Sequence, residues 1–534
     1  MDPRPADAIF HNGNVITMDP HQVDSTAIAV VGERLVFVGD DRSALTLAGP
    51  DTEIVDLVGK TAIPGLIDSH THLELTTFSR HYWTDVRGLS SKQIVDTAVR
   101  LAAERGPGEW VVLQGTFNQE FPDRGTLDRA VPHNPVAIRW SMHIYQLNSH
   151  ALAVSRIDEK TIAPDGARIR VDTGIVEEGW DLLGYSAHPL AAHLQESLRD
   201  TAVELFMQHG VTTIHEIAAS RSGIAAFRAI ADSGSAFPRI RLSLTAAPGH
   251  QPLIEDVESH AKSGLATGFG DSRVKFAGIK IFVDGGRVGA LRSSGICGHG
   301  EHWGLLTRTP QRLANELAAA FDAGIHVWVH AIGDLAQEMT LTAIEQAARA
   351  VPNRDHRTRI EHFGNELYPH NRGLERLLET GGIPAPNPSF IASEPDDPTR
   401  RIPPDVTKYA MRSLLDSGAR PPGNSDTAGA QPFACNPWFT MQCMLERRNT
   451  RGVLVSPQEQ TTVNEALRAF TWDAARAGFQ EDEYGSIAVG KYADIAILNK
   501  NPRATPPQEF STITAETVII GGRTVYAGNL RPEP

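Results

Sequence analysis

Two histidines separated by one residue stand at the end of an apolar run near the beginning of the chain. The stretch is Ala62-Ile-Pro-Gly-Leu-Ile-Asp-Ser-His-Thr-His-Leu73, which indicates a buried strand after a Pro-Gly turn. Side chains two residues apart on a strand share a face, so His70 and His72 can bind one metal ion. For such a pair alone, ordinary surface or loop histidines are the better interpretation. The buried strand, the nearby Asp68 and the residues described next favour a metal site instead.

Four later strand-like runs also carry residues of a kind found at metal sites. They are Lys280 in Ile279-Lys-Ile-Phe-Val-Asp, His330 in His326-Val-Trp-Val-His, His362 in Arg359-Ile-Glu-His-Phe and Asp426 in Pro422-Gly-Asn-Ser-Asp. Together with His70 and His72, these residues could hold two divalent ions that share a bridging hydroxide. Lysine as an ammonium ion has no lone pair to offer a metal. Lys280 must therefore be neutral through desolvation or be chemically converted to an anion.

The runs that carry these residues belong to a longer series in which strands alternate with helices. The other members are Val211-Thr-Thr-Ile-His-Glu, Ile240-Arg-Leu-Ser-Leu-Thr and Ile383-Pro-Ala-Pro, which bring the total with the His70 strand to eight. Eight such units predict a closed parallel (β/α)8 barrel of the TIM type. Its active site would lie at the carboxyl ends of the strands, where the ligand-type residues stand.

Both ends of the chain have a different texture, with short β-rich runs separated by turns. We expect residues 1–62 and 480–534 to form one small β-sandwich domain and residues 63–479 to form the barrel. An insertion at about 76–200 follows the first barrel strand. It has helix-spaced apolar residues over 91–105 and strand-like runs at 110–113 and 136–140.

Composition excludes several classes of protein. The 534 residues include 41% hydrophobic ones and carry a formal charge of −14, which argues against a nucleic-acid partner. Three cysteines are too few for a disulfide framework. The sequence shows neither a signal peptide nor a membrane span, so we expect a cytoplasmic protein that does not bind membranes. An exposed sheet edge in the β-domain could support a homodimer.

The sequence resembles the amidohydrolase superfamily, in the branch that contains N-substituted formamide deformylases. The matching motifs are Pro64-Gly-Leu-Ile-Asp-Ser-His-Thr-His, Lys280-Ile-Phe-Val-Asp-Gly, His330-Ala-Ile-Gly-Asp, Arg359-Ile-Glu-His, Asn424-Ser-Asp and Gly485-Ser-Ile-Ala-Val-Gly-Lys-Tyr-Ala-Asp-Ile-Ala-Ile-Leu. The match covers nearly the whole chain and implies the same barrel and a binuclear metal site.

The resemblance also implies a role for each ligand-type residue. His70 and His72 would hold the more buried ion with Asp426, His330 and His362 would hold the second, and the ions would most simply be zinc. Lys280, carbamylated by carbon dioxide, would bridge them as a carboxylate. Asp426 would take a proton from the attacking water and return it to the leaving amine. The alternative for Lys280 is a structural ion pair with Asp284.

The chain departs from the family pattern at the substrate side. In Ser141-Met-His-Ile-Tyr-Gln-Leu-Asn-Ser-His-Ala-Leu, His143 and Asn148 match the family, whereas Ser141 and Met142 stand where relatives have Asp-Gly. His143 is a candidate catalytic residue that contacts the substrate or its oxyanion, with ordinary loop packing as an equal alternative. Asn387, and Thr427-Ala428 after Asp426, also differ from relatives.

Other polar residues near the strand ends are expected to have supporting roles. We expect His215 to be a packing or supporting residue, His326 to be structural, and Asp334 to orient a ligand. The glycine-rich segment Gly295–Gly304 could be a lid, and its Cys297, His299 and His302 are better explained as part of a solvated loop than as a third metal site.

These observations predict a metal-dependent hydrolase of small molecules. The expected reaction is cleavage of a C–N bond other than a peptide bond, in a formamide, an N-acyl amine, a carbamate or a cyclic amide, and a small, neutral, partly apolar substrate suits the acidic chain. Ester hydrolysis, deamination and decarboxylation remain alternatives on the same site, since a fold does not fix a reaction. An inactive metal-binding protein is the alternative from another class.

Overall fold

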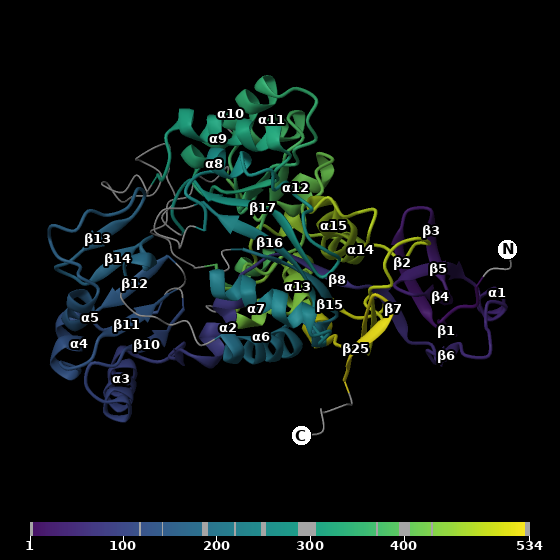
Figure 1. Ribbon diagram of the computed structural model, residues 1–534, viewed down its shortest axis with the longest axis horizontal. Helices are drawn as coiled ribbons and strands as arrows, with labels where there is room; N and C mark the ends of the chain where they lie inside the picture. The colour runs from purple at the N-terminus through teal and green to yellow at the C-terminus, as the bar shows by residue number, and fades with distance from the viewer. Residues whose placement is uncertain are drawn as a thin grey trace.

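The computed structural model describes most of the chain (Figure 1). The described residues are 4–116, 119–140, 143–183, 191–217, 220–246, 253–286, 306–369, 372–394, 406–428 and 431–528. Among them, no helix has both the length and the apolar character needed to cross a membrane.

Seven parallel strands form the central sheet, which curls as in a TIM-like barrel. Their order is β21-β19-β18-β17-β16-β15-β8, and every neighbouring pair is parallel. The strands are β8 (Leu66–Thr71), β15 (Val211–Glu216), β16 (Arg239–Thr245), β17 (Val274–Phe282), β18 (Val327–His330), β19 (Arg359–Glu361) and β21 (Ile383–Ala385).

Helices follow the strands and cover the outer face of the sheet (Figure 1). They include α6 (Ala191–Leu205), α7 (Arg221–Asp232), α8 (Val257–Ala261), α9 (Pro310–Ala323), α10 (Asp334–Ala350), α11 (Gly373–Glu379) and α12 (Met411–Asp416). Later helices are α13 (Pro437–Glu446), α14 (Val463–Arg468) and α15 (Ala474–Ala477).

Strand alternation explains which side chains enter the barrel. Ile279 and Ile281 of β17 belong to the buried cluster that also contains Leu317 of α9 and Ile344 of α10. Because alternate residues of a strand point to opposite faces, Lys280 between them points into the barrel. The same reasoning directs Trp328 and His330 inward from β18, and Arg359 and Glu361 inward from β19, while their neighbours Val327, Val329 and Ile360 pack against the helices.

The predicted eighth strand differs from the expectation. Pro422–Asp426 has no strand ladder, because Pro421 and Pro422 lack a backbone N–H and Asp426 has a positive φ of 45°. The segment nevertheless closes the gap between the two edge strands. Ser69 N donates to Gly423 O (3.1 Å) and Asp426 N donates to His70 O (2.7 Å) on the β8 side. Asn424 Nδ2 donates to Pro386 O (2.8 Å) just after β21.

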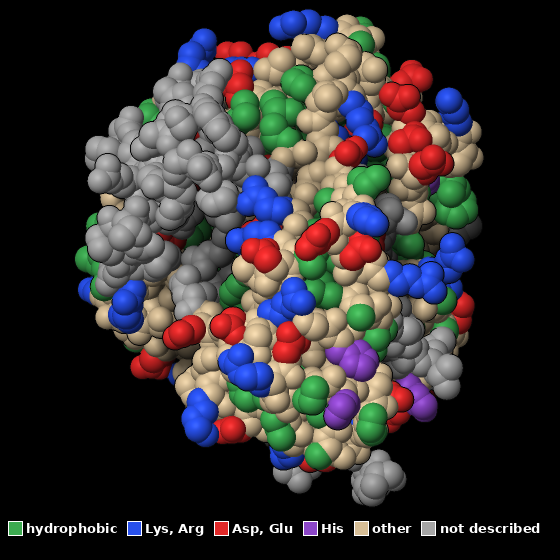
Figure 2. Space-filling model, turned by 90° about the vertical axis from the view of Figure 1, so that its left-hand side faces the viewer, with side chains coloured by type: hydrophobic (Ala, Val, Ile, Leu, Met, Phe, Trp, Pro, Cys, Tyr) green, Lys and Arg blue, Asp and Glu red, His purple; other side chains and the backbone are tan. Residues whose placement is uncertain are grey.

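The predicted insertion is a separate sheet with its own helices (Figure 1, at the left). Its strand order is β13-β14-β12-β11-β10-β9. The elements are β9 (Thr84–Asp85), β10 (Val111–Gln114), β11 (Val136–Arg139), β12 (Ile144–Leu147), β13 (Arg168–Arg170), β14 (Ile175–Glu177), α3 (Ser91–Arg105), α4 (Arg124–Ala130) and α5 (Ser149–Val154). Figure 2 shows this side of the molecule, where basic and acidic side chains alternate over the described surface.

Strands from both ends of the chain pair in one sheet. Its order is β25-β24-β23-β7-β2-β3, with β2 (Asn14–Asp19), β3 (Gln22–Ser25), β7 (Thr61–Pro64), β23 (Ile495–Leu498), β24 (Ala515–Ile520) and β25 (Arg523–Ala527). A second sheet, β5-β4-β1-β6, consists of β1 (Ala8–His11), β4 (Ala27–Val31), β5 (Arg34–Gly39) and β6 (Glu53–Asp56). One buried apolar cluster contains residues of both sheets, among them Val30 and Ile495.

Candidate metal centre

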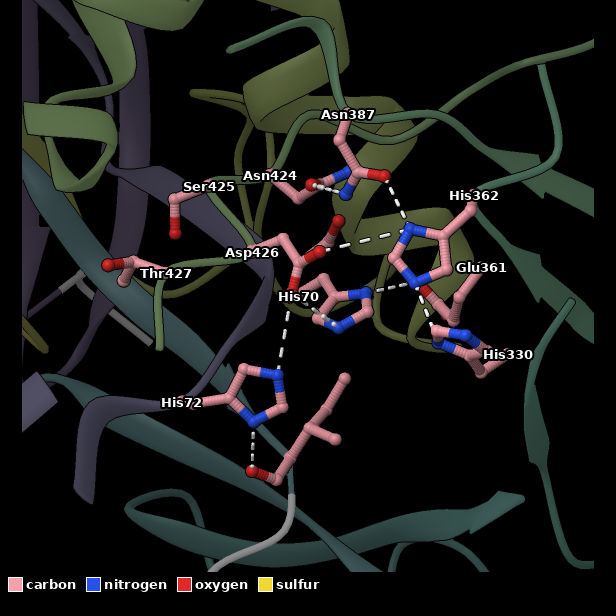
Figure 3. Close-up of polar contacts among 12 residues, drawn as sticks. His70, His72, His330, Glu361, His362, Asn387, Asn424, Ser425, Asp426 and Thr427 are labelled. Carbon is pink, nitrogen blue, oxygen red and sulfur yellow. Dashed lines mark hydrogen bonds and ion pairs between the residues drawn. The ribbon is translucent and has the colours of Figure 1, made fainter. Parts of the chain in front are cut away.

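Three of the predicted ligands converge at the end of β8 (Figure 3). His70 is the penultimate residue of β8, His72 directly follows the strand, and Asp426 comes from the segment that closes the barrel. The Asp426 Oδ1 atom lies 3.2 Å from His70 Nε2 and 3.4 Å from His72 Nε2. The ligand atoms of the three residues all lie within 4.8 Å of one another. Both histidines are buried, whereas the Asp426 side chain is 13% exposed.

The Nδ1 atoms of His70 and His72 each face a hydrogen-bond acceptor of the protein. His70 Nδ1 donates to Glu361 Oε2 at 2.5 Å, and His72 Nδ1 donates to Ile217 O at 2.8 Å. A carbonyl or carboxylate oxygen can only accept here, so each Nδ1 carries a proton, and Nε2 is the nitrogen of each ring that could bind an ion beside Asp426. Burial opposes ionisation of Glu361, but Arg359 and His70 outweigh it and lower the pKa of that carboxyl below its usual range.

His330 and His362 form a second pair with an unusual contact. His330 Nδ1 lies 2.9 Å from His362 Nε2. The other nitrogen of each ring faces an acceptor: His330 Nε2 is 3.3 Å from Gly285 O, and His362 Nδ1 is 2.7 Å from Asn387 Oδ1. If the outer nitrogens carry the protons, the facing nitrogens both carry lone pairs, an arrangement that a cation between the rings stabilises.

Protonation of either facing nitrogen is disfavoured by its surroundings. Burial lowers the pKa of His362 to about 4, and burial together with His362 and Lys280 holds the pKa of His330 well below its ordinary value. Asn387 fixes the His362 tautomer because its own Nδ2 donates to Asn424 Oδ1 at 2.7 Å, which leaves Oδ1 as an acceptor. The donor set of four imidazoles and a carboxylate thus fits divalent ions such as zinc.

Lys280 lies inside the barrel beside both pairs without a hydrogen bond. Its side chain is fully buried, and its Nζ has no hydrogen-bond partner among the described residues. Burial lowers the pKa of Lys280 to about 8, which increases the share of neutral amine near neutral pH relative to an exposed lysine. The alternative ion pair with Asp284 does not form, and the Asp284 carboxylate accepts from the backbone of Ile332 (3.0 Å) and Gly333 (2.8 Å).

Two ligand residues have a left-handed backbone. The φ angle is 75° at His362 and 45° at Asp426, a region that non-glycine residues rarely adopt. Asp68, noted in the sequence only for its charge, holds the second of these turns: Ser425 N and Oγ donate to its carboxylate at 3.1 and 2.5 Å. Burial raises the pKa of Asp68 to about 6.

The remaining candidates lie around this centre. His143 comes from the insertion, and its ring centroid is 5.7 Å from that of His330. His215 stacks on Trp328 and faces Arg359 NH1 at 3.2 Å, in agreement with a packing role. His326 lies deeper and bonds to Trp328. Asp334 is buried at the start of α10, and the Gly295–Gly304 segment, Ser141 and Met142 lie outside the described residues.

Sequence reasoning missed two carboxylates that contact the candidate histidines. Glu361 bonds to His70, and Glu178 lies beside His143 with 2.8 Å between Oε2 and Nδ1. The strand Arg359-Ile-Glu-His contained a signal for the first, because alternation puts Arg359 and Glu361 on one face. No local pattern indicated Glu178, which meets His143 only through the pairing of β12 with β14.

A TIM-like barrel with His-x-His at the end of its first strand is the architecture of a metal-dependent hydrolase. The chain belongs to the amidohydrolase family, whose model matches residues 53–526.

Relatives of known name span nearly the whole chain. An N-substituted formamide deformylase of Arthrobacter pascens is 27% identical, over 93% of this chain and 94% of its own length. The protein LONG AFTER FAR-RED 3 of Arabidopsis thaliana is 28% identical, over 98% and 92% respectively. Among solved structures, an uncharacterized metal-dependent hydrolase from Pyrococcus horikoshii OT3 has a TM-score of 0.73 at 22% identity and covers 94% of this chain and 99% of its own.

Proposed function

We propose that this protein hydrolyses a C–N bond other than a peptide bond in a small molecule, using a water activated by bound metal. The observation that carries the proposal is the contact of His330 Nδ1 with His362 Nε2 at 2.9 Å, beside the cluster of His70, His72 and Asp426. Two lone pairs facing each other in a buried site call for a cation.

We assign His70, His72 and Asp426 to one divalent ion and His330 and His362 to a second, most simply zinc in both places. Lys280, as a carbamate, would supply an anionic ligand to these ions. The neutral amine adds to carbon dioxide and releases one proton, which gives a carbamate anion of the kind that a site of two positive ions would favour. Among the described residues, the buried Nζ has no hydrogen-bond partner, which supports this assignment. Bound ions would lower the pKa of a water and polarise the scissile carbonyl.

Asp426 is the general base and acid in this proposal. Its carboxylate is the one ligand side chain with appreciable exposure, so it faces both the ions and the space where a substrate enters. It takes the proton of the attacking water and returns it to the leaving amine. His143 is the second catalytic residue and contacts the carbonyl oxygen or the leaving group.

The substrate we propose is small, neutral and partly apolar, with N-substituted formamides as the first class to test. The likeness to the Arthrobacter deformylase over nearly the full length supports this choice. The net charge of −14 and the mixed charges in Figure 2 disfavour a polyanion. Ester hydrolysis, deamination, decarboxylation and loss of turnover are the other outcomes of the test.

We also propose the domain division predicted from the sequence. Residues 1–62 and 480–534 form a β-sandwich, and residues 63–479 form the barrel with its insertion. The pairing of β7 with β23 and the apolar cluster shared by the two terminal sheets support this division. A cytoplasmic location and a homodimer stay predictions.

The deciding experiment combines metal analysis, intact mass and a substrate panel. We expect about two equivalents of zinc, manganese, iron or nickel in protein purified without chelator, and an intact mass higher by one carbon dioxide that a Lys280→Met variant lacks. A panel of formamides, carbamates, N-acyl amines, esters and aminopurines follows, with formate, carboxylate and ammonia measured separately. Absence of metal after reconstitution with bicarbonate would overturn the ligand assignment, and ammonia as the sole product would identify a deaminase.

A further inference from the structure

The insertion contributes two side chains to the candidate metal centre. His143 stands immediately before β12 and Glu178 immediately after β14, and the two strands pair antiparallel. Glu178 Oε2 lies 2.8 Å from His143 Nδ1 and Oε1 lies 3.1 Å from it. The backbone joins them as well, because Glu178 N donates to His143 O at 2.7 Å.

The segment that follows β17 fits closely against these two side chains. Gly286 N donates to Glu178 Oε1 at 2.9 Å. A β-carbon at Gly286 would lie 2.7 Å from His143 Cγ, and one at Gly285 would lie 2.8 Å from Glu178 Oε1. Both distances are far below van der Waals contact, so the two glycines leave room for the pair. The same Gly285 carbonyl faces His330 Nε2 at 3.3 Å, which links the pair directly to a candidate ligand.

Glu178 occupies its place at an energetic cost. Its side chain is 5% exposed, so the carboxylate is largely removed from water. Its φ angle is 53°, in the left-handed region that non-glycine residues rarely adopt because it is strained for them. A buried, backbone-strained carboxylate aimed at a histidine beside a metal centre indicates a function beyond packing.

We propose that Glu178 is the positioning residue for His143 and that the insertion thereby completes the substrate side of the site. This inference rests on the proposed function. An ionised carboxylate can only accept, so Nδ1 of His143 carries a proton toward Glu178 and Nε2 is the nitrogen on the other side of the ring. Glu178 and Gly286 together fix the ring plane, and Nε2 is the atom that contacts the scissile group.

Glu178→Gln is the sharpest variant because it keeps the size and inverts the hydrogen bonding. The carboxamide oxygen can still accept from Gly286 N, which turns the amide NH2 toward His143 Nδ1 and forces the proton onto Nε2. We expect kcat to fall about 10- to 100-fold with KM little changed, as for other residues that orient a functional histidine. Metal content and melting temperature should stay at the wild-type values.

Glu177→Gln is the matched control. Glu177 is the preceding residue, is also largely buried, and faces Arg168 and Arg170 of β13 rather than His143. It should leave kcat unchanged. A double-mutant cycle adds a second test: if Glu178 acts through His143, the His143→Ala/Glu178→Gln protein should be no slower than His143→Ala alone.

NMR of the ring nitrogens in ¹⁵N-histidine-labelled, metal-loaded protein shows which nitrogen of His143 carries the proton, and it needs no substrate. The His143 signals are identified by their loss in His143→Ala, and we expect the proton to move from Nδ1 to Nε2 in Glu178→Gln. An unchanged kcat in Glu178→Gln, an additive cycle or an unchanged His143 tautomer would each overturn the inference. If the wild-type protein turns over no member of the panel, the proposed function fails, and the tautomer alone decides whether Glu178 positions His143.

Discussion

At the scale of single residues, the site depends on backbone conformations that side-chain type alone does not impose. Strict alternation along β19 would place His362 on the outer side with Ile360, yet its φ of 75° turns the imidazole toward His330. The φ of 45° at Asp426 likewise lets its carboxylate reach both His70 and His72. Asparagine and aspartate tolerate this region better than most residues, which suits position 426 to a carboxylate.

Asp426→Asn tests the proton transfer because asparagine keeps the shape and the tolerance for positive φ. We expect kcat to fall about a thousandfold, within the range for loss of a general acid and base, while at least one metal ion stays bound. His70→Ala should instead lower the metal content itself. Activity assays and elemental analysis on the same preparations separate the two effects, and near-normal kcat in Asp426→Asn would exclude the proton-transfer role.

His326 is expected to make stability depend on pH. Its Nε2 donates to Arg357 O (2.8 Å) and its Nδ1 accepts from Trp328 Nε1 (2.9 Å), so the folded protein needs the neutral ring. Burial, with Arg359 nearby, lowers its pKa to about 3. The stabilisation is complete above the unfolded pKa of about 6.5 and is lost as pH falls toward 3, by on the order of 4 kcal/mol.

His326→Gln can keep both hydrogen bonds but does not titrate. Urea unfolding between pH 4 and 7 should show a shallower pH dependence in this variant than in the wild type. His133→Gln, at an exposed position, is the control that should follow the wild-type curve. Identical slopes for His326→Gln and wild type would contradict the prediction.

At the scale of elements, Asn148 shows that a residue of a family motif can stabilise the fold of the insertion instead of taking part in the reaction. Its side chain caps α5 through Ala151 N (2.9 Å) and also accepts from Val136 N (3.0 Å). Its Nδ2 donates to Val131 O (3.1 Å) and Asn134 O (2.9 Å). The fully buried amide thus ties β11 to the start of α5.

Asn148→Ala removes all four bonds and leaves buried backbone groups without partners. We expect a loss of about 2–4 kcal/mol in the unfolding transition that involves the insertion. Asn464→Ala, at an exposed position, should cost less than about 0.5 kcal/mol. Equal costs for the two variants in denaturant unfolding would refute this role of Asn148.

The sequence predicted most elements correctly because their signals are local. The seven parallel strands, the helix over 91–105 and the pairing of the termini follow from periodicity, turns and caps. Ser90 and Gln93, for example, form the capping box that starts α3. The prediction of an eighth strand was wrong because Pro421 and Pro422 have no backbone N–H group to donate to a neighbouring strand. This local signal conflicts with the pattern of eight strand-like runs. The roles of Asn387 and Glu178 depend on contacts between distant segments, which one sequence does not reveal, whereas strand alternation already placed Glu361 on the inner face.

At the scale of the whole molecule, a buried ion pair joins the barrel to the terminal sheet. Arg239 Nε and NH2 donate to the two oxygens of Asp494 at 2.7 and 2.9 Å, and Gly521 N donates to the same carboxylate at 2.8 Å. Both charged side chains are almost fully buried. This contact explains the Ala-Asp-Ile motif near the C-terminus, for which the sequence offered only a resemblance.

Asp494→Ala should destabilise the protein strongly, because it leaves the Arg239 guanidinium buried without its counter-charge. The expected loss is about 3–5 kcal/mol in denaturant unfolding. Glu516→Gln is the control, since the ion pair of Glu516 with Lys60 is largely exposed and should be worth less than about 1 kcal/mol. A cost below 1 kcal/mol for Asp494→Ala would show that the terminal sheet docks without this pair.

The segment that closes the barrel without a strand ladder has a consequence for the order of folding. Ser425 and Asp68 are 357 residues apart in sequence, and their hydrogen bonds hold Asp426 against β8. Closing a loop of this length is slow. The closing segment also forms no strand ladder with β8 that could be established before the rest of the barrel folds. We therefore expect the metal cluster to be assembled last. In refolding followed by circular dichroism and by cobalt absorbance together, uptake of the ion should lag behind the recovery of secondary structure.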